Sequence, residues 1–398
     1  MYRLAYICPV IVALAVMSMS GTYSRWWVYA LMLLVAELVI RLVVRRVTRV
    51  HEYLSGYATN VQHHEAWVER QEHEIEERDS DGEVHRRVEV SYVNHPDEWW
   101  MVLNTGRSIR IAEQVYNQCV AWWKTKEHWI DPPHVDCVRG GGGQLYMWNG
   151  VYENAYTCTY QGLYVNYLNN SNSIFRKGNI SRDEVDMLGL VEYPKIEYLD
   201  VDVVLLSSDV ARRISINNGV QRCFQLINAF AGERFEIHLF ILLFDASRGI
   251  DIALKQQEYW RGGNKNEFVV CLGIDPDSLV PGRTLVVEWC KAFSWCDAPR
   301  LESATESWFI EHRRLNEQAF ADWFRHNIHL WKRKEFSDFK YLGVRLSGTR
   351  SLMLALVTAL FCCAIFYVAC LMGQYVDGDV VNARIAEFFK FVWNRTFG

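Results

Sequence analysis

One stretch near the carboxyl end constrains the chain more than any other feature. Residues Leu352–Met372 form 21 consecutive positions without a charged side chain. A helix rises about 1.5 Å per residue, so this run would extend about 30 Å, the thickness of the hydrocarbon core of a bilayer. A buried core helix of that length is uncommon. The sequence therefore predicts a transmembrane helix at 352–372.

Two further apolar runs occupy the amino-terminal part of the chain. Leu4–Met19 is uncharged, and Trp26–Val44 follows with two tryptophans at its start, as is usual at a membrane interface. We interpret residues 1–44 as a hairpin of two transmembrane helices. A cleaved signal peptide is the alternative for the first run, because Arg3 precedes it and small residues follow it.

Basic residues determine the predicted orientation. Arginines cluster at the end of the second apolar run, and lysines and arginines precede the last run, whereas Asp377 and Asp379 follow it. By the positive-inside rule, the region between these clusters is cytoplasmic and the C-terminal tail lies on the outer side. The unpatterned cysteines of that region agree with a reducing compartment. The sequence thus predicts an integral membrane protein whose soluble region is cytoplasmic.

The tail after the last apolar run has a pattern of its own. Apolar and aromatic residues recur at helical spacing through residues 380–397, and polar residues occupy the other side. This pattern predicts an amphipathic helix that lies in the lipid interface. A helix packed against a partner protein is the alternative. The lipid bilayer is therefore one predicted partner.

From Val47 the apolar spacing alternates between three and four residues, as in a heptad repeat. The pattern continues to Ile75 and predicts a helical stalk at 45–80. Self-association as a coiled coil and packing against the protein's own domain are equal alternatives for this helix. Turn residues at Asp79–Gly82 end it. Residues 84–200 then indicate a mixed α/β domain that is rich in aromatic residues and contains strands.

Composition narrows the range of partners. The net charge of −5 excludes a globally basic nucleic-acid binder, so no nucleic acid is expected as a partner. Sixteen tryptophans are an unusual excess, and aromatic side chains favour protein interfaces. We take Trp260, Trp289 and Trp295 as candidate interaction residues.

From Ser207 onward, helix and strand patterns alternate. An amphipathic helix is predicted at Gly219–Phe230, a strand buried on both faces at Phe235–Phe244, a second helix at Ile250–Trp260, and another strand at Phe268–Leu272. This βαβ order indicates a sheet with helices on its faces.

Three stretches of this region carry a family resemblance: GVQRCFQLINAF, IHLFILLFDAS and EYWRGGNKNEFVVCLGI. They resemble TPM domains over about residues 207–341, which implies an α/β/α fold. In that family, Trp-Gly, a polar turn with Asn and a run of aliphatic residues follow the second helix, and Trp260, Gly262 and Asn266 match these positions. The usual Asn-Gly pair is Asn-Glu here, and family members are usually placed outside the cytoplasm. Phosphatase activity is claimed for some members, while others look like assembly or repair factors for membrane complexes.

Polar residues at the ends of the predicted strands form a candidate metal site. Asp245 closes a buried strand, where an α/β sheet places ligand-binding groups, and Asp251 follows it. Asn264 and Asn266 precede the next strand. Oxygen ligands of this kind suit Ca²⁺ or Mg²⁺, and we expect them at one edge of the sheet. The same residue types are also common turn formers, which is the alternative.

The predicted fold class is thus a membrane-anchored α+β protein with an amino-terminal transmembrane hairpin, a helical stalk, a mixed α/β region that includes a TPM-like domain, and a carboxyl-terminal transmembrane helix. The predicted function is an adaptor or assembly factor for an unknown membrane or cytosolic protein. The alternative function is a TPM-like phosphatase or hydrolase that depends on a divalent cation at Asp245.

Overall fold

Contacts within the chain divide it into two units. One contains residues 1–50, 163–177 and 335–398, and the other contains residues 51–162 and 178–334. The predicted apolar run 4–19 and the predicted amphipathic helix 380–397 lie outside the residues that the structure describes. In the computed structural model, the described residues are 26–78, 84–125, 134–136, 143–165, 180–196, 199–260, 265–333 and 348–375.

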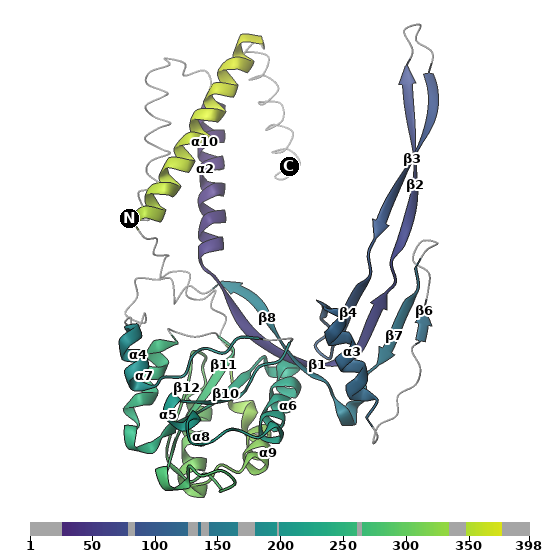
Figure 1. The fold of residues 1–398 in the computed structure, drawn as a ribbon. Coiled ribbons are helices and arrows are strands. Elements are labelled where there is room, and N and C mark those ends of the chain that lie inside the picture. Colours follow the sequence, from purple (N-terminus) through teal and green to yellow (C-terminus); the bar gives the residue numbers. More distant parts are fainter. Residues whose placement is uncertain are drawn as a thin grey trace, which may run out of the picture. The chain divides into compact units, whose positions relative to one another are not determined.

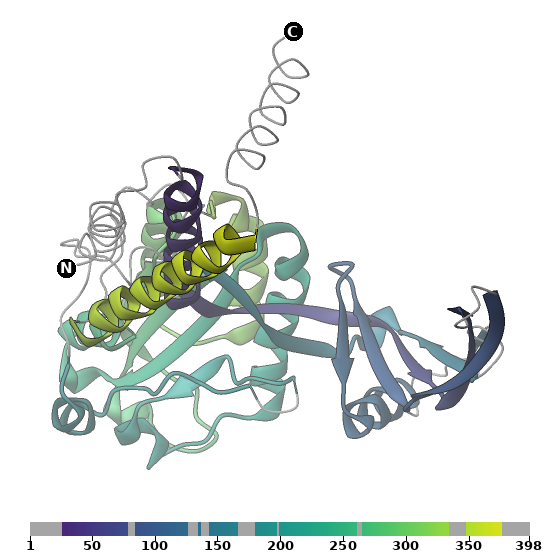
Figure 2. The same ribbon diagram turned by 90° about the horizontal axis from the view of Figure 1, so that it is seen from above.

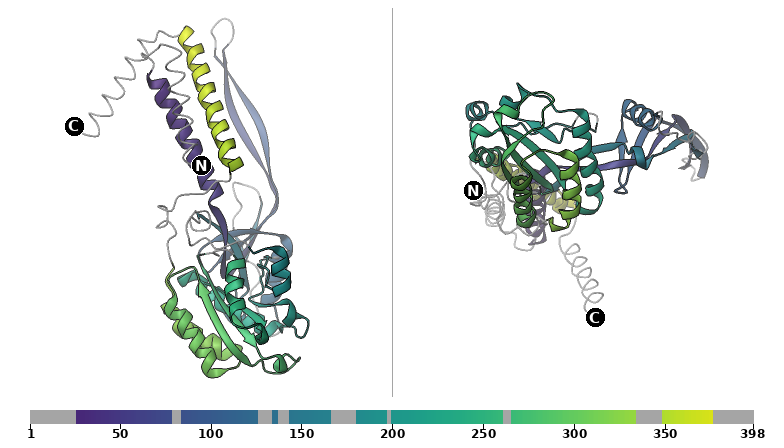
Figure 3. Two further views of the ribbon diagram at one scale, coloured as in Figure 1. Left: turned by 90° about the vertical axis from the view of Figure 1, so that its left-hand side faces the viewer. Right: turned by 90° about the horizontal axis from the view of Figure 1, so that it is seen from below.

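In the first unit, helices α2 (Trp26–Val47) and α10 (Gly348–Tyr375) lie side by side (Figures 1 and 3). Ile40 of α2 and Leu354 of α10 are buried. Thr358 is also buried, and its hydroxyl donates to the carbonyl oxygen of Leu354 at 2.9 Å. Small and apolar side chains therefore line the contact between the two helices.

Among the described residues, no helix is both long enough and apolar enough to cross a membrane. The prediction of spanning helices at 26–44 and 352–372 is therefore corrected, and with it the membrane-anchored fold class and the integral-membrane localisation. In α2 the ion pair Glu37–Arg41, at 2.6 Å, interrupts the apolar run, and two arginines occupy the last turn. Two packed helices of a mixed α/β chain replace the predicted spans.

Residues 45–80 do not form a helical stalk. Beyond the end of α2 they form the strands β1 (Arg49–His64) and β2 (Trp67–Arg78). β2 pairs with β3 (Val84–His95) along its whole length as a two-stranded ribbon (Figure 1). The predicted coiled coil is therefore wrong. β3 begins at Val84, the first residue of the region in which strands are predicted.

The second unit contains a six-stranded sheet built around β1. Its strand order is β5-β4-β1-β7-β6, and β8 pairs with β1 as well. Helix α3 (Glu113–Trp123) packs on the sheet, and its Cys119 and Trp123 share a core with Val61 and Met101. The other strands are β4 (Glu98–Leu103), β5 (Ser108–Ile111), β6 (His134–Asp136), β7 (Leu145–Asn149) and β8 (Thr157–Val165).

A second sheet in the same unit has the order β12-β11-β10-β9. β9 (Val204–Leu206), β10 (His238–Asp245) and β11 (Glu267–Ile274) are parallel, and β12 (Val287–Ser294) is antiparallel to β11. Every residue of β10 and β11 is buried, as predicted for strands that are covered on both faces. The predicted βαβ order is confirmed here.

Helices cover both faces of this sheet. The first face packs against α5 (Ser208–Ala211), α6 (Asn218–Phe235), α8 (Pro299–His312) and α9 (Glu317–Asn327). The second packs against α4 (Arg182–Leu188) and α7 (Asp251–Tyr259). Since α6 and α7 cross on opposite faces while the chain moves in one direction across the sheet, the two crossovers have opposite hands. One of them therefore departs from the usual right-handed rule.

Buried polar side chains hold the first half of β1 against this sheet. Figure 2 shows the course of the strand beyond this contact. The hydroxyl of Ser55 lies 3.0 Å from Nδ1 of His238 and 2.9 Å from the hydroxyl of Thr159. Burial lowers the pKa of His238 to about 3, so its ring is neutral at ordinary pH. On α6, a Cβ atom at Gly232 would lie 2.0 Å from the carbonyl oxygen of Ser55. β1 and α6 therefore approach each other backbone to backbone.

Replacing Gly232 tests this contact, because two effects of the replacement change the stability of the protein in opposite directions. Helix propensity favours Gly232→Ala by about 1 kcal/mol, whereas a methyl group against the backbone of β1 costs about 1–3 kcal/mol and displaces Ser55. We expect Gly232→Ala to lower the free energy of unfolding in urea titrations. Gly219→Ala, near the start of the same helix, meets only the Asn217 side chain and is the control. A Gly232→Ala protein more stable than wild type would contradict the close approach.

Candidate functional site

The predicted metal-site residues do not lie at one edge of the sheet. Asp245 ends β10 at its carboxyl edge, whereas Asn266 precedes β11 at the opposite, amino edge. Because β10 and β11 are parallel and His238 pairs with Glu267, eight residue steps separate the two positions along the sheet. At about 3.3 Å per step the separation is roughly 26 Å, beyond any shared coordination shell. The prediction was wrong because α7 returns the chain from the carboxyl edge of the sheet to its amino edge before β11 begins.

Each of these residues has a structural role where the structure describes it. Asp245 caps the following turn, since its Oδ1 accepts from both the backbone N–H and the hydroxyl of Ser247. Asp251 begins α7, and Asn266 is buried and donates to the carbonyl oxygen of Tyr53. Asn264 lies outside the described residues. Within the described ranges, no group of three or more His, Cys, Asp or Glu side chains is placed to hold a metal ion.

The three candidate interaction tryptophans belong largely to the interior. Trp260 is 8% exposed, and its indole N–H donates to the carbonyl oxygen of Val191 at 2.9 Å. Trp289 packs over Gly273 and donates to the carbonyl oxygen of Ala246. Trp295 is partly buried against Phe293, with ring centroids 5.4 Å apart. The tryptophan excess is thus used in packing at these positions.

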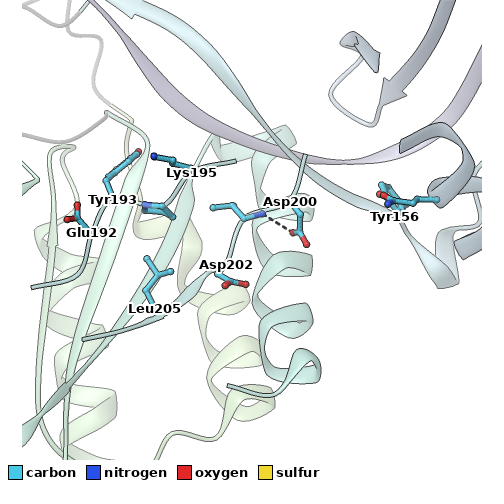
Figure 4. A pocket seen from close by; sticks show the side chains of 10 residues that line it. Tyr156, Glu192, Tyr193, Lys195, Asp200, Asp202 and Leu205 are labelled. Carbon is cyan, nitrogen blue, oxygen red and sulfur yellow. Dashed lines mark hydrogen bonds between the residues drawn. The ribbon is translucent and has the colours of Figure 1, made fainter. Parts of the chain in front are cut away.

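The structure brings a different set of polar side chains together in an open cleft of about 930 Å³ (Figure 4). Asp200 and Asp202 lie on the extended segment that leads into β9. Figure 4 shows these two carboxylates between Glu192 on one side and Tyr156 on the other. A second hollow of about 320 Å³ shares Tyr156 and both aspartates. The remaining lining of the main cleft is Gln118, Tyr193, Pro194, Lys195, Val201 and Leu205.

The surroundings of the two aspartates disfavour their ionised form, although the charge of Arg222 partly offsets this for Asp200. Burial among the surrounding atoms raises the pKa of Asp200 and of Asp202, although both remain accessible to solvent. Oδ1 of Asp200 accepts from the backbone N–H of Val201 at 2.8 Å and from the Gln225 amide at 2.6 Å. Among the described residues, neither aspartate has a cationic partner within 4.0 Å. Titratable groups with shifted pKa values in a cleft are typical of functional sites.

The nearby Arg222 is occupied elsewhere. Its guanidinium donates to the hydroxyl of Thr157 and the carbonyl oxygen of Ala155, and it lies 5.0 Å from the ring centre of Trp122. Burial lowers its pKa. Burial also raises the pKa of Tyr156 to about 12, so its hydroxyl stays protonated. The cleft thus offers carboxylate acceptors and a neutral phenol.

Sequence reasoning missed this cleft. The available signal was the Asp-Val-Asp motif at 200–202, which places two carboxylates on the same side of an extended segment. Nothing in the local sequence shows that Gln118 and Tyr156 close the cleft from more than forty residues upstream. The site therefore depends on the packing of the six-stranded sheet near the α/β sheet.

The raised pKa values predict how stability responds to removing a charge. Because the folded state holds the Asp202 proton more tightly than the unfolded chain, ionisation costs stability above the folded pKa. We expect Asp202→Asn to raise the melting temperature at pH 7.5, with a gain that shrinks as the pH falls. Asp183→Asn, at an exposed position of α4, serves as the control and should show no such gain. A loss of stability in Asp202→Asn at pH 7.5 would show that this carboxylate is structural.

Comparison of the chain with protein-family models gave no match, and neither the curated proteins nor the solved structures contained a similar protein.

Proposed function

We propose that this protein is a binding module, an adaptor that holds a cationic segment of a protein partner in the cleft at Asp200 and Asp202. The observation that carries this proposal is a pair of carboxylates in an open cleft whose pKa values are raised and which form no ion pair within 4.0 Å among the described residues. Their raised pKa values mean that ionisation costs more in the unbound protein than it does in water. A lysine or arginine side chain from a partner would relieve that cost.

The shape and lining of the cleft support an extended ligand. Its volume of about 930 Å³ is at the upper end of ordinary ligand sites, and it is open to solvent rather than enclosed. Tyr156 and Tyr193 provide aromatic surface against which the aliphatic stem of a lysine or arginine can pack. Lys195 adds one positive charge at the rim, which suits a segment that carries an acidic group beside its cation.

The adaptor role is also one that the resemblance of residues 207–341 to TPM domains implies. The phosphatase alternative rested on a shared cation at Asp245 and Asn266. Since these residues lie at opposite edges of the sheet, that alternative has lost the site on which it was built.

Binding of a labelled peptide tests the proposal. The probe is acetyl-trilysine amide with a fluorophore, and the measurement is fluorescence anisotropy with the full chain. We expect the double variant Asp200→Asn/Asp202→Asn to bind at least about tenfold more weakly, a change of about 1.4 kcal/mol that suits the loss of charge-assisted hydrogen bonds. The single-charge control Asp183→Asn, on the surface of α4, should bind as wild type does.

The pH dependence of the same binding follows from the raised pKa values. A cation binds the ionised carboxylates, so affinity should fall as the pH is lowered from 7.5 towards the raised pKa of each aspartate. An acetylated triglutamate probe should not bind at any pH. Equal binding of trilysine by wild type and the double variant would indicate general attraction to an acidic protein and would refute the site.

A further inference from the structure

The ribbon of β2 and β3 carries an uncovered apolar surface. Successive side chains of a strand alternate between faces, so Val88, Val90 and Tyr92 lie on the same face of the ribbon. Their exposed fractions are 52%, 37% and 66%. Among the described strands, β3 pairs only with β2, so its outer edge has no strand partner there. A two-stranded ribbon is at best marginally stable in water.

Charge distinguishes the two edges of this ribbon. β3 carries three charged side chains, Arg86, Arg87 and Glu89, among its valines and Tyr92, whereas β2 carries seven. A charged edge repels a second copy of itself and discourages strand addition, whereas an edge of β-branched and aromatic residues favours it. β3 is therefore the edge that accepts another strand, and β2 is protected by five glutamates: Glu69, Glu72, Glu74, Glu76 and Glu77.

We propose that β3 pairs antiparallel with β3 of a second copy of this chain, in the register centred on Val90. Val90 then lies opposite its own counterpart, and Val88 lies opposite Tyr92 of the second copy. On the other face, Glu89 meets Ser91 and Arg87 meets Val93. No charged side chain directly faces one of the same sign. The exposed apolar residues of both copies form one continuous patch of cross-strand pairs.

The same charge distribution limits the assembly to two copies. Pairing through β3 produces a sheet of order β2-β3-β3-β2, whose two outer strands are the acidic ones. Further strand addition is opposed at both ends, and the twofold arrangement yields a dimer rather than a fibre. This dimer is independent of the cleft at Asp200 and Asp202.

Sedimentation velocity over a concentration series of the full chain tests the proposal. Wild type should show a monomer–dimer equilibrium. Val90→Lys places two lysines opposite each other at the twofold axis and should weaken dimerisation at least about tenfold. Val68→Lys makes the same change at an exposed position of β2 and should leave dimerisation unchanged. A monomer at all concentrations, or equal dimerisation of Val90→Lys and wild type, would overturn the proposal.

Disulfide trapping tests the register. Under mild oxidation, Val90→Cys should yield a covalent dimer, because the two introduced thiols face each other across the axis. Val68→Cys should not do so beyond the level of wild type, which measures any cross-link formed by the eleven cysteines of the chain itself. Equal cross-linking of Val68→Cys and Val90→Cys would contradict the β3 edge as the interface.

Discussion

β1 connects the two sheets of the second unit, and it is a strand that must fit two different environments along its length. Its first half lies against the α/β sheet, where Tyr53 is part of a core with Phe240. Its second half is the centre of the six-stranded sheet, where Val61 packs in another core. Between them, Ser55 reaches the neutral ring of His238. The amide nitrogen of Asn228 lies 3.5 Å from Nε2 on the other side of that ring. A charged histidine here would lose its hydration, which explains why its pKa is so low.

The attachment of β1 is reinforced near its beginning by an ion pair. Nη2 of Arg333 lies 3.0 and 3.2 Å from the two carboxylate oxygens of Glu52, and its Nη1 contacts Glu236. Both Arg333 and Glu52 are largely buried, at 15% and 6% side-chain exposure. Removing one member of such a pair leaves the other charge desolvated, which is the costly change, whereas the intact pair adds little net stability. The main effect of the pair is therefore to fix the position of the start of β1 next to Arg333. Its contribution to the net stability of the fold is small.

How far the sequence could be interpreted depends on how uniform each segment's surroundings are. β10 and β11 were predictable because helices cover both faces of each strand, and unbroken apolar runs record that environment. β1 was mistaken for a helix because its buried positions follow two cores instead of one alternating face. The prediction for β2 was wrong for another reason. Glu, Gln and Arg favour helices locally, and only pairing with β3 makes the segment a strand. The cleft at Asp200 was hidden because its walls come from distant segments.

The polar groups of this protein differ in whether other groups of the same chain provide their hydrogen bonds and balance their charge. Asp245 is capped by Ser247, and Trp260 donates to a backbone carbonyl, so both are accounted for by the fold. Asp200 and Asp202 are different, because their surroundings disfavour the charge, and the positive charge of Arg222 offsets this only in part for Asp200. The outer edge of β3 is the backbone counterpart of the same condition, with strand hydrogen-bonding groups that β2 does not use. Groups of this kind, which lie at the surface, are the ones that a second molecule can reach and satisfy. That contrast, rather than residue type, separates the candidate binding surfaces from the structural aspartates and tryptophans.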